Sequence, residues 1–207
     1  MVVMPSRNVI RHDLPESYYH VYARGANKDI IFIDESDKDY FLYLLSRHLS
    51  KREVVTRNGY PYPHFRNKIE LLTYCLMDNH FHLLFYQRDQ GILSELMKSI
   101  MVSYTAYFNN KYGRTGPVFG SRFKASLVNK DSYLLHVSRY IHLNPRSWRN
   151  YKFSSFKYIR KGTEPEWLQS EKVLELHSNR RQYGIFVADY EENKKMLSEL
   201  KYVLADN

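Results

Sequence analysis

The feature that most constrains the fold is a pair of strand-like runs separated by only two residues. Residues 69–77 and 80–87 are rich in aliphatic and aromatic side chains, and Asp78-Asn79 lies between them. A two-residue connection is typical of a tight β-hairpin turn, so we expect the two runs to be antiparallel neighbours in one sheet. Any fold for this chain has to be built around that hairpin.

Further elements alternate on both sides of the hairpin. The residues of 18–23 have strand character up to Gly25, and residues 122–128 form another candidate strand. Apolar residues at helical spacing predict helices beginning near Ser36, near Leu93 and at Asp131.

Boundary residues support these three helices. Ser36 with Asp39 is a capping-box signal, and Asp131 is a suitable N-cap. Gly113 ends the second helix, and Asn144-Pro145 stops the third after Leu143. Residues 51–67 contain Asn58-Gly59 and two prolines, which predict a loop with at most a small hairpin.

The resulting order, β-α-β-β-α-β and a further helix, is that of an α+β ferredoxin-like split βαβ sandwich. We expect a central antiparallel sheet with the helices on one face. Composition changes after residue 163, so we expect a domain over residues 1–163. Residues 164–207 would then be a C-terminal helical appendage of two or three short helices.

Basic residues are concentrated in one part of the chain. The net charge is +9, from 31 Lys and Arg against 22 Asp and Glu, and residues 96–163 hold 13 of the basic residues with Asp131 as their single acid. Aromatic residues are interleaved with these cations, which suits stacked bases and a phosphate backbone. A solvated basic face over an aromatic core is the simpler interpretation for any single residue. For the segment as a whole, we expect a nucleic-acid partner.

Cysteine content and hydropathy restrict the compartment. The single cysteine, Cys75, forms no internal disulfide, and no run approaches the roughly 20 apolar residues of a membrane span. The first residues lack the long apolar core and small-residue cleavage site of a signal peptide. We therefore expect a soluble cytoplasmic protein with no membrane partner.

Two histidines interrupt the second strand of the hairpin. On a strand, residues i and i+2 share a face, so His80 and His82 point one way while Phe81 points into the opposite layer. Such a pair can chelate one divalent metal ion. A strand histidine pair is more often incidental than a ligand pair, but here it is the polar interruption of a strand that continues through Leu83, Leu84 and Phe85.

The helix after Asp131 carries a second pattern. Tyr133, His136, Tyr140 and Asn144 are spaced by three, four and four residues, which predicts one helical stripe. Leu134, Val137 and Ile141 form a separate apolar stripe for packing. A half-buried packing role for Tyr140 is the simpler alternative in a chain with 19 tyrosines.

Together these parts suit phosphodiester chemistry. A phenol has a pKa near 10, so a tyrosine oxygen is both a moderate nucleophile and a competent leaving group. A metal ion held by His80, His82 and the Asn144 side-chain oxygen would act as a Lewis acid on the phosphate. All three ligands are neutral, and Mg²⁺ or Mn²⁺ fits such a loosely held, phosphate-completed site.

Several segments in order resemble the IS200-like Y1 (HUH) transposases, and among them the REP-associated tyrosine transposases. The resemblance covers about residues 17–160. It rests on a His-hydrophobic-His element and a Tyr-Ile-x-Leu-Asn-Pro element, together with shorter segments elsewhere: Tyr19-His20-Val21, Arg24-Gly25, Leu76 to Leu84, Tyr107-Phe108-Asn109, Gly116 to Phe119, Arg122-Phe123 and Tyr140 to Pro145.

The resemblance implies a single-stranded DNA endonuclease and strand transferase that recognises hairpin DNA. The family's nucleophile falls on Tyr140, its metal-binding histidines on His80 and His82, and its third ligand on Asn144. The family's products are a 5′-phosphotyrosine adduct and a free 3′-hydroxyl. We expect a monomer rather than a homodimer. The residues expected to contact DNA are Arg24, Lys111, Arg114, Phe119, Arg122, Lys124, Arg139 and Arg146.

One departure from the family pattern lies beside the histidine pair. Asp78 stands where relatives usually have proline, and we expect its negative charge to influence metal affinity.

Rival functions remain open at this stage. A histidine-triad nucleotide hydrolase would need a third histidine at position 84, which is Leu84. An RNA-binding module of the same topology would also use basic and aromatic residues, and a domesticated transposase would bind DNA without moving it. Mutation of the histidines, the tyrosine and the asparagine separates these functions. In a nuclease these mutations abolish cleavage, whereas in a binding module the property to measure is loss of binding.

Overall fold

The computed structural model describes residues 13–128 and 131–189. Its sheet consists of β1 (Ser17–Arg24), β2 (Ile69–Met77), β3 (His80–Gln87) and β4 (Lys124–Val128). All neighbours are antiparallel and the order is β2-β3-β1-β4. This is the order of a ferredoxin-like split βαβ sandwich, so the predicted α+β fold is confirmed.

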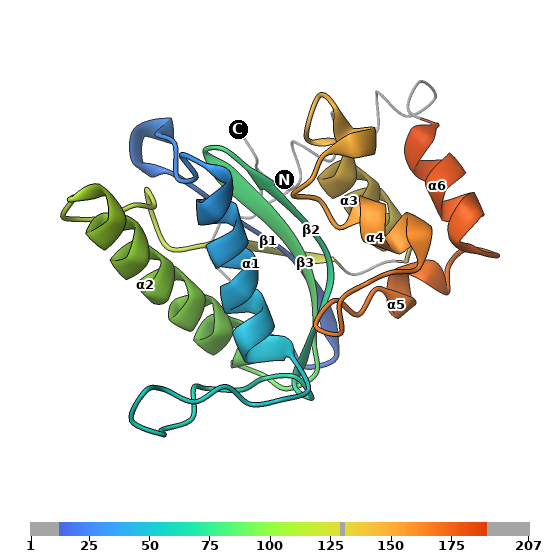
Figure 1. Ribbon diagram of the computed structural model, residues 1–207. Coiled ribbons are helices and arrows are strands. Elements are labelled where there is room, and N and C mark those ends of the chain that lie inside the picture. The colour runs from blue at the N-terminus through green and yellow to red at the C-terminus, as the bar shows by residue number, and fades with distance from the viewer. Residues whose placement is uncertain (1–12, 129–130, 190–207) are drawn as a thin grey trace, which may run out of the picture.

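Helices cover both faces of the sheet, as Figure 1 shows. The first two, α1 (Glu35–Leu49) and α2 (Ile92–Tyr112), lie on one face. On the other face α3 (Asp131–Leu143) packs on β2 and β3, with the remaining helices outside it: α4 (Phe156–Lys161), α5 (Glu171–Leu174) and α6 (Arg180–Ala188). The expectation of helices on one face only is therefore wrong, because the second face of β1 and β3 is also buried and needs cover.

Apolar side chains fill the space between the sheet and helices α1 and α2. Phe81, Leu83 and Phe85 alternate along β3 and are fully buried. The Phe81 ring lies 4.9 Å from that of Phe41 in α1 and 6.0 Å from that of Phe119. Burying each such side chain stabilises the fold by about 1.5–3 kcal/mol.

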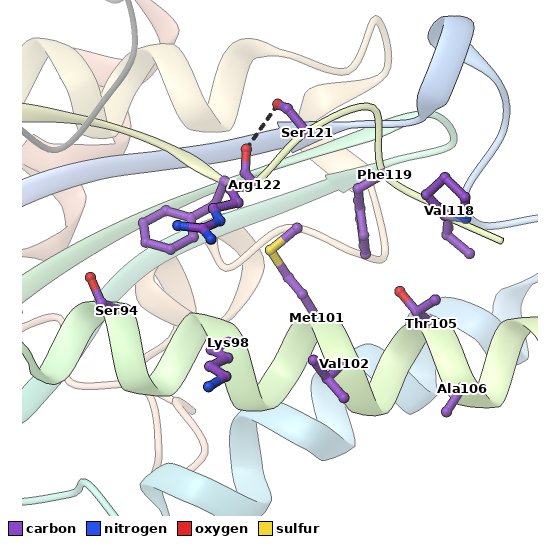
Figure 2. Close-up of a pocket in the computed structure, with 12 residues that line it drawn as sticks. Ser94, Lys98, Met101, Val102, Thr105, Ala106, Val118, Phe119, Ser121 and Arg122 are labelled. Atoms are coloured by element: carbon purple, nitrogen blue, oxygen red, sulfur yellow. Dashed lines mark hydrogen bonds between the residues drawn. The ribbon is translucent and has the colours of Figure 1, made fainter.

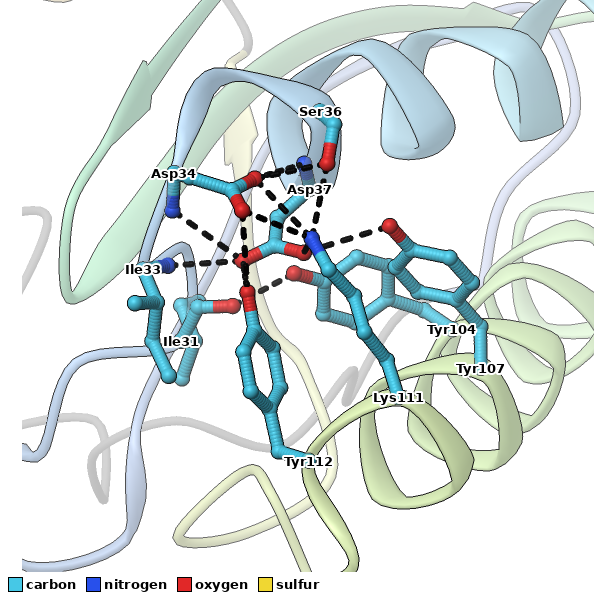
Figure 3. Close-up of polar contacts among 9 residues, drawn as sticks. All are labelled: Ile31, Ile33, Asp34, Ser36, Asp37, Tyr104, Tyr107, Lys111 and Tyr112. Atoms are coloured by element: carbon cyan, nitrogen blue, oxygen red, sulfur yellow. Dashed lines mark hydrogen bonds and ion pairs between the residues drawn. The ribbon is translucent and has the colours of Figure 1, made fainter.

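A polar cluster fastens the start of α1 to the end of α2 (Figure 3). Asp34 is the N-cap of α1 and forms a capping box with Asp37, so the cap lies two residues before the predicted Ser36. Lys111 Nζ lies 2.7 Å from Asp37 Oδ1 and 2.9 Å from Asp34 Oδ2. Tyr112 Oη donates to Asp37 Oδ2 at 2.8 Å. The Lys111 hydrogen bond holds the pKa of Asp34 below its ordinary value.

Residues after α3 cover the free edge of β2. Leu76 N donates to Phe153 O at 3.0 Å, and Gln169 N donates to Leu71 O at 2.8 Å. Beyond this edge, α6 is fastened to α3 through a buried hydrogen bond of 2.9 Å between Tyr183 Oη and His142 Nδ1. The predicted short C-terminal helices are present up to residue 188. Residues 190–207 lie outside the described part of the chain.

The remaining predicted boundaries agree closely with the structure. Strands β2 and β3 begin and end as predicted, and α3 ends at Leu143. The fourth strand is shorter than predicted and begins at Lys124. Residues 51–67 form a loop with one isolated bridge between Val55 and Pro61. The helices of the described residues include none with the length and hydropathy of a membrane span.

Candidate active site

Strand register gathers polar side chains on the sheet face that α3 covers. In β1 and β3, Tyr22 lies opposite His82 and Arg24 lies opposite His80. In β4, Lys124 lies opposite Tyr22. Directly opposed residues point to the same face of a sheet, so three strands contribute to one polar patch. This patch, with α3 beside it, is the candidate active site.

His80 is held in one tautomer by its neighbour. The Asn79 side-chain nitrogen donates to Lys28 O at 3.2 Å, so Asn79 Oδ1 faces His80 Nδ1, at 2.6 Å. His80 Nδ1 therefore carries the hydrogen and donates it. His80 Nε2 is left with its lone pair and lies 3.4 Å from Asn144 Oδ1. These two acceptor atoms face each other, so a cation could bind between them.

His82 is paired with a histidine that sequence analysis did not assign to the site. His82 and His20 are both fully buried, and His82 Nδ1 lies 2.9 Å from His20 Nε2. Their rings are stacked with centroids 5.1 Å apart. This contact uses Nδ1 of His82, so a metal ion at this ring would meet Nε2. The available signal for His20 was its position in β1, where it shares a face with Tyr22 and Arg24.

Burial keeps these imidazoles neutral. Desolvation lowers the pKa of His20 to about 3 and that of His80 to about 4. The pKa of His82 is also lowered well below its ordinary value, first by burial and then by His20 and His80. Neutral imidazole is the form that binds metal ions.

Tyr140 lies over the histidine pair. Its ring meets the His82 ring edge-on at a centroid distance of 5.4 Å and the His20 ring at 6.0 Å. The neighbouring Val137 and Ile141 are fully buried, as predicted, and fix this face of α3 toward the sheet. Tyr140 itself is 4% exposed.

The predicted stripe along α3 does not hold together as one site. Asn144 follows α3 and reaches His80, but Tyr133 is 39% exposed. His136 faces α6, where its ring lies 5.9 Å from that of Phe186. The stripe fails because α3 is packed on two sides, by the sheet and by α6.

The side chains fit a weakly held metal ion. Among residues 13–128 and 131–189, no group of three or more His, Cys, Asp or Glu side chains forms a metal site. The arrangement present is instead two neutral imidazoles and one amide oxygen. Such a set gives low intrinsic affinity and leaves coordination positions for water and phosphate oxygens.

Two of the predicted DNA-binding residues flank this site. Arg24 and Lys124 line a small cleft of about 110 Å³ together with Tyr22 and Gly120. The Lys124 ammonium lies 5.5 Å from the centre of the Tyr22 ring. Both cations are therefore placed to hold a phosphate beside the histidines.

Phe119 and Arg122 lie on the opposite side of the sheet. They line a cavity of about 850 Å³ between α2 and the segment before β4 (Figure 2). Met101 and Val102 of α2 form its apolar wall, and Lys98 adds a cation. The structure therefore separates these two predicted DNA contacts from Tyr140.

The other predicted DNA contacts occupy varied positions. Arg114 and Arg146 are exposed. Lys111 is held by Asp34 and Asp37, which compensate its charge. Arg139 is 2% exposed, with its guanidinium 3.5 Å from the centre of the Phe186 ring. Direct DNA contact by Lys111 or Arg139 is thus not supported, because one is ion-paired and the other lies beneath α6.

Asp78 has an ion pair of its own, and its expected influence on metal affinity stays a prediction. Asp78 Oδ1 lies 2.6 Å from Lys38 Nζ, so its negative charge is compensated on the α1 side of the hairpin. Lys38 is mostly buried, and its ammonium lies 5.1 Å from the centre of the Phe153 ring.

Comparison with known proteins gives a family-model match over part of the chain and a similar solved structure. Residues 64–144 match the family model described as "Transposase IS200 like". A solved structure of a REP-associated tyrosine transposase bound to a REP hairpin has a TM-score of 0.52 and 14% sequence identity, and the match covers 77% of this chain and 88% of that chain. None of the curated proteins compared with the chain matches it. At that identity, the structural match shows a shared fold.

Proposed function

Because the chain is related to the IS200-like Y1 transposases over residues 64–144, we propose that it is a metal-dependent single-stranded DNA endonuclease and strand transferase. Tyr140 is the proposed nucleophile and hairpin-containing DNA the proposed substrate. The observation that carries the proposal is the contact of Tyr140 with His82, next to the facing lone pairs of His80 and Asn144. The hairpin in the structurally similar transposase supports the choice of substrate.

His80 Nε2, His82 Nε2 and Asn144 Oδ1 are the proposed ligands of Mg²⁺ or Mn²⁺. A bound ion would polarise a phosphoryl oxygen and neutralise charge in the transition state. The residues behind these ligands set their orientation. Asn79 accepts from His80, and His20 is hydrogen-bonded to His82.

The proposed reaction is a transesterification. Tyr140 Oη forms a bond to phosphorus, and the bond from phosphorus to the 3′-oxygen breaks. The departing oxygen takes the electron pair and a proton and becomes a 3′-hydroxyl, while the phenol proton passes to solvent. The product is a 5′-phosphotyrosine adduct. Because a phenol with a pKa near 10 is a good leaving group, attack by another 3′-hydroxyl reverses the step and joins a new strand.

Arg24 and Lys124 are the proposed phosphate-positioning residues. Both lie in the cleft at the edge of the patch, where their charge attracts the DNA backbone. Since Tyr140 is 4% exposed, entry of the scissile phosphate requires a displacement of the groups around the phenol.

Nicking of labelled hairpin DNA in the presence of Mn²⁺ tests the proposal. We expect cleavage by the wild-type protein, its loss in excess chelator, and its collapse in His80→Ala and His82→Ala. Asn144→Ala should be milder, because water replaces one neutral ligand. His136→Ala is the control, since it removes a histidine that faces α6. Full nicking in chelator would contradict the proposal.

The competing proposal is a DNA- or RNA-binding protein of the same fold without strand transfer. The near-complete burial of Tyr140 favours it. Tight hairpin binding without any nicking in either Mg²⁺ or Mn²⁺ would identify it.

A further inference from the structure

A second cationic cavity lies outside the family-matched region. It has a volume of about 510 Å³, within the usual range of ligand sites, and lies between the short helix η2 (Trp148–Asn150), α4 and α6. Arg149, Arg160 and Arg181 line it, and none of its lining residues is acidic.

Among the described residues, the three arginines have no acidic partner in an ion pair. The adjacent Arg180 differs, because it is paired with Glu164 and donates to Ile159 O. Three exposed guanidinium groups around one hollow favour an anionic ligand, and planar forks suit phosphate oxygens.

An aromatic ring completes the cavity. Trp148 packs against Phe156 with ring centroids 5.1 Å apart, and the Arg149 guanidinium lies 4.3 Å from the centre of the Trp148 ring. The face of α6 opposite is apolar, with Ile185 50% exposed. An aromatic ring can stack on a base, and the surrounding cations can bind the phosphates, so this combination suits a nucleotide.

The cavity is close to the candidate active site along the chain. Trp148 follows Asn144 by four residues, so their Cα atoms are at most about 15 Å apart. At about 3.4 Å of rise for each stacked nucleotide, roughly four nucleotides cover that distance.

We propose that this cavity, the Trp148 cavity, binds the single strand of DNA that flanks the hairpin. A base stacks at Trp148, and backbone phosphates bind Arg149, Arg160 and Arg181. The inference rests on the proposed function only for the identity of the strand. It gives the C-terminal helix α6 a role in choosing the nucleotides next to the cleaved bond.

Paired arginine substitutions test the cavity. Arg149→Ala/Arg181→Ala removes two cavity cations, and the control Arg52→Ala/Arg57→Ala removes two exposed cations from the 51–67 loop. Both doubles are made in a Tyr140→Phe chain, so binding is measured without cleavage. The ligands are a DNA hairpin alone and the same hairpin with a thymidine flank on the 5′ or the 3′ side.

We expect the Arg149→Ala/Arg181→Ala protein to lose affinity for one of the two flanked hairpins. The slope of log affinity against log salt for that hairpin should become shallower by about 1.4, because each of two lost single-strand phosphate contacts contributes about 0.7. Binding of the bare hairpin should change no more than in the control double. Equal losses in the two doubles, or no loss with either flank, would overturn the proposal.

Trp148 fluorescence gives an independent readout. Trp167→Phe leaves Trp148 as the single tryptophan of the chain. Flanked hairpin should quench its emission more than bare hairpin, and the same quenching by both would contradict stacking. Failure of the proposed function is recognised separately, because a chain that never nicks DNA can still show flank-dependent quenching.

Discussion

His20 is a positioning residue: it orients the imidazole of His82, the proposed metal ligand. Its imidazole is fully buried against His82, and the two rings are nearly parallel, at 11°. With Nδ1 of His82 engaged by His20, the proposed ligand nitrogen is Nε2, on a ring that also contacts Tyr140. A partner of this kind fixes the tautomer and orientation of a metal-binding histidine.

We predict that His20→Leu raises the dissociation constant for Mn²⁺ about 10- to 100-fold, because His82 loses its hydrogen-bond partner. His20→Gln should be milder, since its amide can still reach His82. Equilibrium dialysis or calorimetry with Mn²⁺ alone measures the effect without DNA. His48→Gln is the control, as His48 is equally buried on the other side of the sheet. Unchanged affinity in His20→Leu would exclude an orienting role.

The sequence could identify the proposed ligand residues better than the residues that support them. His80 and His82 follow from strand alternation, and Asn144 from its place after the tyrosine helix. His20 was hidden because a single histidine in an aromatic strand has no partner in local sequence. Its partner is 62 residues away and is defined only by strand register.

Between elements, a polar cluster connects α1 to α2. Asp37 is fully buried, and it accepts from Lys111 and from Tyr112. Within residues 13–128 and 131–189, Lys111 is the one cation paired with Asp37. Removing such a cation leaves a buried carboxylate uncompensated, which costs about 3–5 kcal/mol in other proteins. Lys111 is partly exposed, so the lower end of that range applies.

We predict that Lys111→Met lowers the free energy of unfolding by about 3 kcal/mol and leaves hairpin affinity unchanged. Urea denaturation and a DNA titration at a temperature where the variant is folded measure the two quantities. Lys98→Met is the matched control, because it removes an exposed lysine of the same helix and should change stability by less than about 0.5 kcal/mol. A stable Lys111→Met protein with weakened DNA binding would return Lys111 to the set of DNA contacts.

The elements themselves were largely predictable. The hairpin was fixed by its two-residue turn, and the sheet order followed from the alternation of elements. The α1 cap was misplaced because Asp34 with Asp37 and Ser36 with Asp39 both satisfy a capping pattern. Lys111, which lies 77 residues from Asp34, favours the first pair. The position of α6 on α3 depends on His142 and Tyr183, whose contact no local pattern indicates.

For the whole molecule, folding divides the basic segment among different surfaces. Lys124 borders the histidine site, Arg122 lies by the α2 cavity, and Arg149 lies in the Trp148 cavity. Composition predicted a polyanion partner but not this division, because it depends on which strand edge and helix end each cation occupies.

We predict that the chain prefers single-stranded or hairpin DNA over plain duplex and that its affinity falls steeply with salt. Each neutralised phosphate contributes about −0.7 to the slope of log affinity against log salt for single strands. Lys124→Ala should lower both affinity and slope while Mn²⁺ binding persists. A titration without a salt slope, or equal affinity for duplex, would contradict the role assigned to the basic surface.

Tyr140 is the proposed nucleophile, and covalent capture of DNA tests this role most directly. Each variant is incubated with labelled hairpin DNA and Mn²⁺, denatured, and examined for a protein band that carries the label. Tyr140→Phe removes one oxygen and little packing, so we predict a folded, DNA-binding protein that forms no adduct. Tyr133→Phe alters the exposed tyrosine of the same helix and should form the adduct normally. An adduct in Tyr140→Phe, or one mapped by mass spectrometry to another tyrosine, would contradict the account.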